Sequence, residues 1–299
     1  MCELTHFNGA LMDLRSQIRS ICLYYRSGTT LAVQLQLVLL SILQLSRIPA
    51  HYISKERADR FLNRERADRF RLRVYSKLLR NSKVVYQQKY FFVQNAKDFE
   101  ILTLEPDLSL FLNDDYQGTF LDVGAHIGKY SVLFADRFRK VVAVEPEEDN
   151  FSTLMRNIRL NKLEGKITAI RRAVYNESDL ALTITLDSLN LGAHSVISSS
   201  TSRDAPLRQQ EVRTITIDDV TRRCKIRPEE ISFVKIDVEG AEYFVLDGMR
   251  EVLAVGRAKL VIEVLDAQRV KKVISLLAEY GYTVTQIDAI DYLAEKKPE

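Results

Sequence analysis

FLDVGAHIGKYS, from Phe120 to Ser131, joins an apolar strand-like run to an amphipathic segment through a turn that holds two glycines. The expected strand ends at Val123, and ligands of open α/β sheets bind at the carboxyl ends of strands, so this turn is a ligand turn by position. It has neither the GxxxxGK(S/T) pattern of a P-loop nor the G-x-G-x-x-G pattern of dinucleotide-binding turns. The remaining pattern is D-x-G-x-x-x-G, and its acid is Asp122.

Two acids at the ends of successive strands point to the kind of ligand. Asp122 would be awkward beside a pyrophosphate, but it suits a ligand that carries an ammonium and a sulfonium group. Glu145 follows the next buried apolar run, 23 residues later, and a carboxylate there can accept hydrogen bonds from both hydroxyls of a ribose. Pro146 offers a flat apolar face to a base. S-adenosylmethionine fits both ends of this arrangement, whereas a lone turn of this kind could be purely structural.

A third motif, FVKIDVEGAEYFVLDGM at 233–249, places three ionisable groups on one apolar strand. Alternation puts Lys235, Asp237 and Glu239 on one side if the strand persists. Charges on a central strand are costly unless they are paired or used, so the motif is either a buried ion-pair and capping network or part of the active site.

The chain from residue 83 alternates between strand and helix patterns, which predicts a mostly parallel sheet covered by helices on both faces. The last two strands are too close for a crossover and must be antiparallel. KVVYQQKYFFV from Lys83 has strand composition, and EPDLSLFLND from Glu105 predicts a short helix. The expected sheet strands are 119–123, 140–145, 166–171, 231–237, 259–265, 282–287 and 292–295. Helices are expected at 128–137, 147–161, 239–252 and 268–280, and two further strands at 180–187 and 211–218.

Residues 1–82 predict a helical, basic N-terminal extension that precedes a domain over 83–299. Residues 47–89 hold 13 basic and 4 acidic side chains, and ERADRF occurs at 56–61 and again at 65–70. These features describe either a solvated basic helix or a surface for an anionic partner such as phospholipid or nucleic acid. The apolar stretch from Leu31 is interrupted by polar residues, which favours a buried or interfacial helix, with a membrane-surface helix as the alternative.

The three cysteines are widely spaced and form no CxxC or Cys/His cluster, which argues against a disulfide framework or a zinc site. This pattern fits a reducing cytosol, and we expect a cytoplasmic protein, with membrane association as an open alternative. The oligomeric state is left open.

Four blocks in the chain resemble the FkbM family of S-adenosylmethionine-dependent methyltransferases. They are FLDVGAHIGKYSVLFA, VVAVEPEEDNFSTLMRNIRLN, TITIDDV and VKIDVEGAEYFVLDGM, in the family's order, and the likeness extends over roughly 88–299. The resemblance implies a class I methyltransferase fold, a Rossmann-like α/β architecture with a seven-stranded sheet, and usually O-methylation of a hydroxyl on a sugar or other small molecule. His126 departs from the family, which commonly has Asn there.

The resemblance also implies roles for individual residues. The methionine portion of the cofactor would be lined by Asp122, Gly124, Ala125, His126 and Gly128. The ribose would be held by Glu145, and the adenine would be flanked by Pro146, Arg172 and Ala173. The methyl group and the acceptor would face Asp237 and Glu239.

An alcohol acceptor must lose its proton, and the candidates for a general base are Asp237, Glu239, Glu263 and His194. The three carboxylates could instead gather a divalent cation, and no ligand spacing decides the metal question. Two rival functions are an N-methyltransferase acting on protein or nucleic acid and a non-enzymatic binding protein on the same scaffold. Asp237-Val-Glu-Gly stands where amino-directed nucleic-acid enzymes usually carry an Asn/Asp-Pro-Pro-aromatic turn, which makes nucleic acid a disfavoured substrate.

Overall fold

The structure is a computed structural model that describes residues 82–112, 118–186, 194–195, 208–255 and 257–296. By its backbone contacts the chain divides into two compact units, Met1–Asp107 and Leu108–Glu299. The helical extension expected over 1–82, with its ERADRF repeat and apolar stretch, lies outside the described residues except for Ser82. The expected domain boundary at residue 83 stays a prediction. Within the described ranges, no helix combines the length and apolarity needed to cross a membrane.

The first unit contains a β-hairpin in the segment from Lys83 whose composition predicted strand structure. Strands β1 (Ser82–Tyr86) and β2 (Lys89–Val93) pair antiparallel, and helix α5 (Ala96–Leu104) follows. Gln87 and Gln88 form the two-residue turn with φ of 46° and 64°, the left-handed values that a type I′ hairpin requires. Asn95 caps α5 by accepting a hydrogen bond from the N–H of Asp98. The sequence analysis missed this helix.

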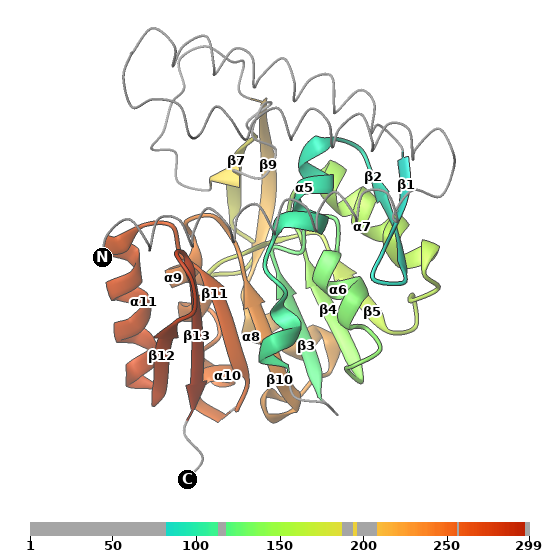
Figure 1. The fold of residues 1–299 in the computed structure, drawn as a ribbon. Helices are drawn as coiled ribbons and strands as arrows, with labels where there is room; N and C mark the ends of the chain where they lie inside the picture. Colours follow the sequence, from blue (N-terminus) through green and yellow to red (C-terminus); the bar gives the residue numbers. More distant parts are fainter. Residues whose placement is uncertain (1–81, 113–117, 187–193, 196–207, 256, 297–299) are drawn as a thin grey trace, which may run out of the picture. The chain divides into compact units, whose positions relative to one another are not determined.

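The second unit is built around a seven-stranded sheet with the order β12-β13-β11-β10-β3-β4-β5 (Figure 1). Strand β13 runs antiparallel to both of its neighbours, and the other strands pair in parallel, as the sequence predicted. The strand order reverses between β3 and β10, so the carboxyl ends of these two strands form the switch point where α/β sheets bind ligands. The strands are β3 (Thr119–Val123), β4 (Lys140–Val144), β5 (Ile167–Ile170), β10 (Ile231–Ile236), β11 (Lys259–Glu263), β12 (Tyr282–Gln286) and β13 (Asp291–Lys296).

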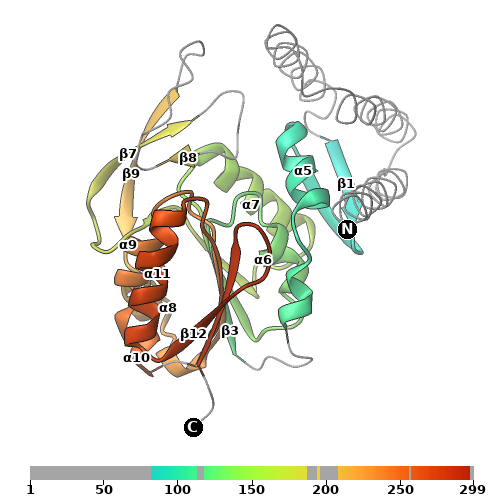
Figure 2. The same cartoon turned by 60° about the vertical axis from the view of Figure 1, so that its left-hand side comes forward.

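Helices cover both faces of this sheet (Figure 2). Alternate residues of the central strands face opposite helix layers. Phe120 and Phe233 pack with Phe134 and Phe138 on the face that α6 covers. Leu121 and its same-face neighbours join the apolar side chains of α8 to α11 in one core on the other face. The helices are α6 (Lys129–Phe134), α7 (Glu148–Leu160), α8 (Ile217–Cys224), α9 (Glu242–Asp247), α10 (Arg250–Val255) and α11 (Ala267–Glu279).

Three expected elements differ from the structure. The helix expected over 239–252 is two helices, α9 and α10, because α9 ends at Gly248, where a Cβ would lie 2.3 Å from the carbonyl oxygen of Tyr175. The helix expected from Glu105 is only the 3-10 turn Leu108–Phe111. The strand expected over 211–218 is β9 (Arg208–Ile215), and α8 begins at Ile217.

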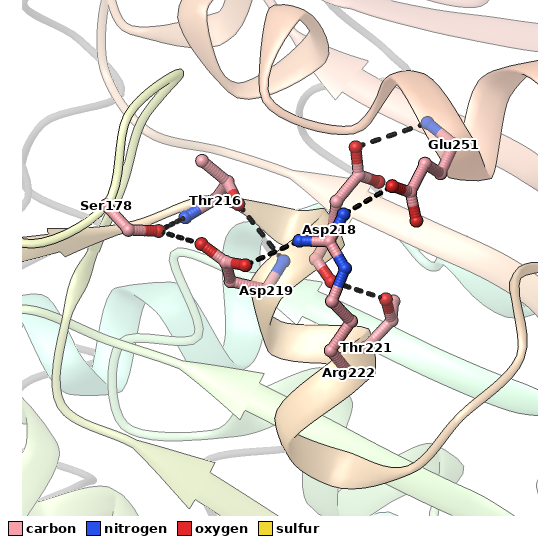
Figure 3. Close-up of polar contacts among 7 residues, drawn as sticks. All are labelled: Ser178, Thr216, Asp218, Asp219, Thr221, Arg222 and Glu251. Atoms are coloured by element: carbon pink, nitrogen blue, oxygen red, sulfur yellow. Dashed lines mark hydrogen bonds and ion pairs between the residues drawn. The ribbon is translucent and has the colours of Figure 1, made fainter.

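An insert between β5 and α8 forms a four-stranded sheet of its own, with the order β6-β9-β7-β8. Its other strands are β6 (Ala173–Val174), β7 (Ala181–Leu186) and β8 (His194–Ser195). Figure 3 shows how the insert is tied to α8. The Ser178 hydroxyl accepts from the N–H of Thr216 and donates to Asp219, while the Thr216 hydroxyl caps α8 by accepting from the N–H of Asp219. This cap explains why, in the TITID segment at 214–218, the strand ends at Ile215 and a helix follows.

Candidate active site

The turn after β3 is held against the ends of the two neighbouring strands. The N–H groups of Gly124 and Ala125 both donate to the carbonyl of Val144, at 2.9 and 3.1 Å. Gly124 has φ of 81°, and a Cβ there would lie 1.8 Å from the carbonyl oxygen of Asp237, which follows β10. His126 and Gly128 also have positive φ, 49° and 84°. The turn therefore packs directly against the backbone that follows β10, because only glycine permits this approach.

Asp122 lies beneath this turn rather than at its surface. Its side chain is fully buried, and Oδ2 accepts hydrogen bonds from the N–H and the hydroxyl of Ser131 in α6. Burial raises the pKa of Asp122, while nearby Lys235 and the bonds from Ser131 act to lower it. Oδ1 has no hydrogen-bond partner among the described residues. Asp122 thus fastens the start of α6 to the end of β3.

Glu145 joins the turns that follow β3 and β4. Its Oε2 accepts from the N–H of His126 and its Oε1 from the N–H of Glu147, each at 2.9 Å. The side chain is 4% exposed. Burial raises the pKa of Glu145 to about 7, although both backbone donors favour the ionised form. Two turns predicted separately from the sequence therefore meet at one carboxylate.

The residues expected around adenine lie on the β5 side of Glu145. Pro146 is half-buried, and its carbonyl accepts from the Nε2 of Gln210 in β9 at 3.4 Å. Ala173 is buried in β6, and Arg172 is half-buried just before it. The insert thus reaches back to the turn after β4, since β9 supplies Gln210.

An ion pair between Lys235 and Asp237 lies at the carboxyl end of β10. Lys235 Nζ lies 2.8 Å from Asp237 Oδ2 and 5.1 Å from the centre of the Tyr130 ring. Lys235 is also opposite Asp122 in the parallel register of β10 and β3. The buried ammonium therefore lies among carboxylates from two strands, which offsets the cost of burying it.

The chain beyond β10 turns sharply through Glu239 and Gly240, whose φ angles are 48° and 114°. Glu239 is half-buried. Glu242, at the start of α9, is buried and accepts from the N–H of Gly240 through Oε1. Burial raises the pKa of Glu242. The sequence predicted Asp237 and Glu239 at this edge, and the structure adds Glu242 to them.

Asp291 is an acid of this region that the sequence analysis missed. It begins β13 and lies opposite Glu263, the last residue of β11. Burial raises the pKa of Asp291 to about 7, helped by the hydrogen bond that its protonated carboxyl donates to Asp288 and by the negative charge of Asp288. The charge of Lys235 acts to lower this pKa, and that of Asp237 acts to raise it. Because β13 is antiparallel, its first residue lies at the same edge as the last residues of β10 and β11. The DAID segment before the final strand was the signal that could have located it.

His194 lies in β8, where it pairs with Leu186 of β7, and its side chain is outside what the structure describes. Its assignment as a general base stays a prediction. Among the described residues, no group of three or more His, Cys, Asp or Glu side chains is arranged to hold a metal ion.

Known structures resemble this chain at low sequence identity. Methyltransferase FkbM from Methylobacillus flagellatus KT is 17% identical with a TM-score of 0.46, over 95% of this chain and 60% of that one. M. jannaschii tRNA m1G37 methyltransferase is 13% identical with a TM-score of 0.40, over 73% and 58%. M. jannaschii TYW2 in complex with AdoMet is 12% identical with a TM-score of 0.41, over 73% and 88%. The chain thus spans less than two thirds of the first two proteins.

A comparison with curated proteins finds no match. The methyltransferase FkbM domain, by contrast, matches residues 122–284, which is more than half of the chain. This range begins at the buried acid of β3 and includes Glu145 and the complete Lys235–Glu242 segment. It therefore contains both turns of the candidate site, and the protein belongs to the FkbM family of methyltransferases.

Proposed function

We propose that the protein transfers a methyl group from S-adenosylmethionine to a hydroxyl group of a sugar or another small molecule. The observation that carries the proposal is Glu145, a buried carboxylate that accepts one backbone N–H from each of the two turns at the switch point. A carboxylate has about four lone-pair positions, and the two backbone N–H groups and the Asn150 side chain use three of them, which leaves one for a ribose hydroxyl. This donor chemistry fits the nucleoside end of the cofactor.

The other end of the cofactor suits the turn after β3. Gly124 and Gly128 let the turn pack closely against Asp237 and Leu154, and the buried carboxylate of Asp122 holds Ser131 and thereby the start of α6. In this proposal Asp122 acts mainly through the turn it positions. Asp122, Asp237 and Asp291 all lie near the Lys235 ammonium, and a cationic ligand at the carboxyl ends of these strands would favour ionisation of the two acids whose pKa is raised, Asp122 and Asp291.

When bound, S-adenosylmethionine supplies a methyl group that its sulfonium already activates. The chain must then orient the acceptor hydroxyl, and positioning of this kind can contribute about 7–11 kcal/mol to the reaction barrier. Lys235 holds one oxygen of Asp237, which leaves the other oxygen to accept a hydrogen bond from that hydroxyl. Removal of the proton by a general base typically adds about 10²–10⁴-fold in rate. Asp237 and Glu239 are the residues we assign to these tasks.

Cofactor binding is tested by titration calorimetry with S-adenosylmethionine and S-adenosylhomocysteine. Glu145→Ala should weaken both ligands by about 10-fold or more, because hydrogen bonds to a charged group are worth about 1.5–3 kcal/mol each. Glu148→Ala is the matched control, since Glu148 is exposed and pairs only at the surface with Arg171. Equal dissociation constants for wild type and Glu145→Ala, both folded, would contradict the ribose assignment.

The acceptor class is tested by incubating the protein and methyl-labelled S-adenosylmethionine with cell extract that is separated into small-molecule, protein and nucleic-acid fractions. We expect label on small molecules that survives mild base as an ether. Label in protein or nucleic acid would favour the N-methyltransferase alternative. Absence of cofactor binding would favour the scaffold alternative.

A further inference from the structure

A cavity of about 630 Å³ lies between β5 and the C-terminal end of α8. Arg171 and Arg172 follow β5, Arg223 and Lys225 come from the end of α8, and Lys140 begins β4. In the described part of the sheet, β5 is the edge strand, so this cavity opens along a strand whose outer side has no neighbouring strand there.

The charge of the cavity is one-sided. Five of its nine lining residues are Arg or Lys, and none of the nine is acidic. The cations are also partly fixed in place, since Lys140 Nζ donates to the carbonyl of Cys224 at 3.1 Å. Burial raises the pKa of the Cys224 thiol, whereas the charges of Lys140 and Arg223 act to lower it, so both cations lie close to this side chain. Arg171 reaches Glu148, which is outside the lining, at 3.4 Å.

The like charges repel one another, and an anion would supply the countercharge that the nine lining residues lack, while solvent screens the exposed Arg171, Arg223 and Lys225. Guanidinium groups present a planar fork of N–H donors that matches the oxygens of a phosphate, and lysines add point charges. Ala169 and Ile170 of β5 give the wall an apolar part. The volume falls within the range of about 300–1,000 Å³ that is usual for small-ligand sites.

One end of the cavity, at Lys140, lies away from the candidate active site, whereas Arg172 at its other end is a residue expected beside the adenine. Lys140 begins β4, and Glu145 follows the other end of the same strand. Four residue steps of a strand span about 13 Å, so the Lys140 end of the cavity lies at the opposite edge of the sheet from the candidate methyl-transfer region.

We propose that this cavity, formed by β5 and the end of α8, is a binding site for the phosphate group of an organic phosphate or a phospholipid headgroup. It holds that phosphate through Arg223, Lys225 and Lys140, at the end of the cavity that lies away from Glu145. This site requires neither S-adenosylmethionine nor the acceptor, so it stands or falls independently of the proposed reaction.

The first test is calorimetric titration of the full chain with inorganic pyrophosphate, together with its effect on the unfolding temperature. We expect saturable binding that stabilises the native protein, because a ligand that binds only the native state raises its stability. In Arg223→Gln/Lys225→Gln the dissociation constant should rise by about 10-fold or more, since two charge-assisted contacts are lost. Arg137→Gln is the matched control, because it removes one exposed cation from the turn after α6, outside the cavity.

The second arm identifies the source of the phosphate with vesicles of phosphatidylcholine alone and vesicles that also contain phosphatidic acid. Binding to the phosphatidic acid vesicles that the double substitution weakens and Arg137→Gln does not would assign the site to a membrane phosphate. Pyrophosphate binding with no such vesicle binding would assign it to a soluble phosphate. The proposal is overturned if wild type binds neither probe, or if the double variant binds both within twofold of wild type.

Discussion

Lys235 and Asp237 form an ion pair, with 2.8 Å between Nζ and Oδ2, on the side of β10 that faces Asp122 of the next strand. Their side chains are only 10% and 21% exposed. The pair places a positive charge inside the region where we expect a cationic cofactor. The acids around it therefore have two roles, since they must offset the ammonium whether or not a ligand is bound.

Lys235→Met should destabilise the protein strongly. Removing one partner of a buried ion pair leaves uncompensated charge, and typical losses are about 3–5 kcal/mol. Lys259→Met is the matched control on β11, because Lys259 pairs with Glu295 in a more solvent-accessible position, with side chains 29% and 44% exposed, and pairs near the surface contribute about 0–1 kcal/mol. Urea unfolding of both variants measures the difference. Similar losses in the two variants would show that Lys235 is not offset by buried acids.

Asp237→Asn and Glu239→Gln should separate chemistry from cofactor binding. Both changes preserve shape and remove charge, so turnover should fall by about 10²-fold or more if either carboxylate orients or deprotonates the acceptor. The dissociation constant for S-adenosylhomocysteine should change much less. A chelator should abolish the methyltransferase activity of wild type if the carboxylates bind a metal ion. It should leave that activity intact if they act as a general base. Near-normal turnover in both variants would direct the search to Glu263 and His194.

Gly124→Ala should cost about 2 kcal/mol or more, because the new Cβ would lie 1.8 Å from the carbonyl oxygen of Asp237 and φ is 81°. Gly165→Ala is the control, since a Cβ there meets no atom within 4 Å. It should change stability by no more than about 0.5 kcal/mol. Thermal or urea unfolding gives both values. A tolerated Gly124→Ala would mean that the turn after β3 is free to move away from β10.

Stability should fall as pH rises between about 4.5 and about 7. Glu145 and Asp291 both have a folded pKa near 7, above their ordinary values, so the unfolded chain loses these protons first and ionisation favours unfolding through this window. Below this pH window the loss of stability is absent, and above about pH 7 the loss is complete. Glu145→Gln and Asp291→Asn should each flatten the profile of unfolding free energy against pH. Unchanged profiles in both variants would refute the assignment.

Much of the fold follows from apolar runs that end in an acid. The runs before Asp122, Glu145 and Asp237 predicted three adjacent strands, and parallel pairing then placed their acidic ends along one edge. Asp291 was not predicted, because its strand is antiparallel. Its acid therefore comes at the start of the apolar run rather than at its end. The register of Lys235 opposite Asp122 also escaped, because strand order cannot be read from the pattern of one strand.

The other wrong predictions arise where local structural preferences compete, or where a distant contact decides the structure. TITID has strand composition through Ile217. The Thr216 hydroxyl and the two acids that follow Ile217 favour the start of a helix, so the strand ends at Ile215. The hairpin of β1 and β2 has Gln87-Gln88 at a turn that usually carries Asn or Gly, so it gave no turn signal. Gly248 interrupts a helical pattern through its contact with Tyr175, a residue 73 positions away that no local pattern reveals.

The insert leaves and re-enters the fold through neighbouring strands. Strand β6 pairs in parallel with the end of β9, and β7 pairs with β9 over six residues from Ala181↔Arg213 to Leu186↔Arg208. The two ends of segment 187–207 are therefore set side by side by β7 and β9, whatever lies between them. Segments of other lengths or compositions can be grafted between Leu186 and Arg208 without shifting the register of the seven-stranded sheet. We expect that exchanging loops among relatives at this junction would test whether the segment contributes to acceptor preference.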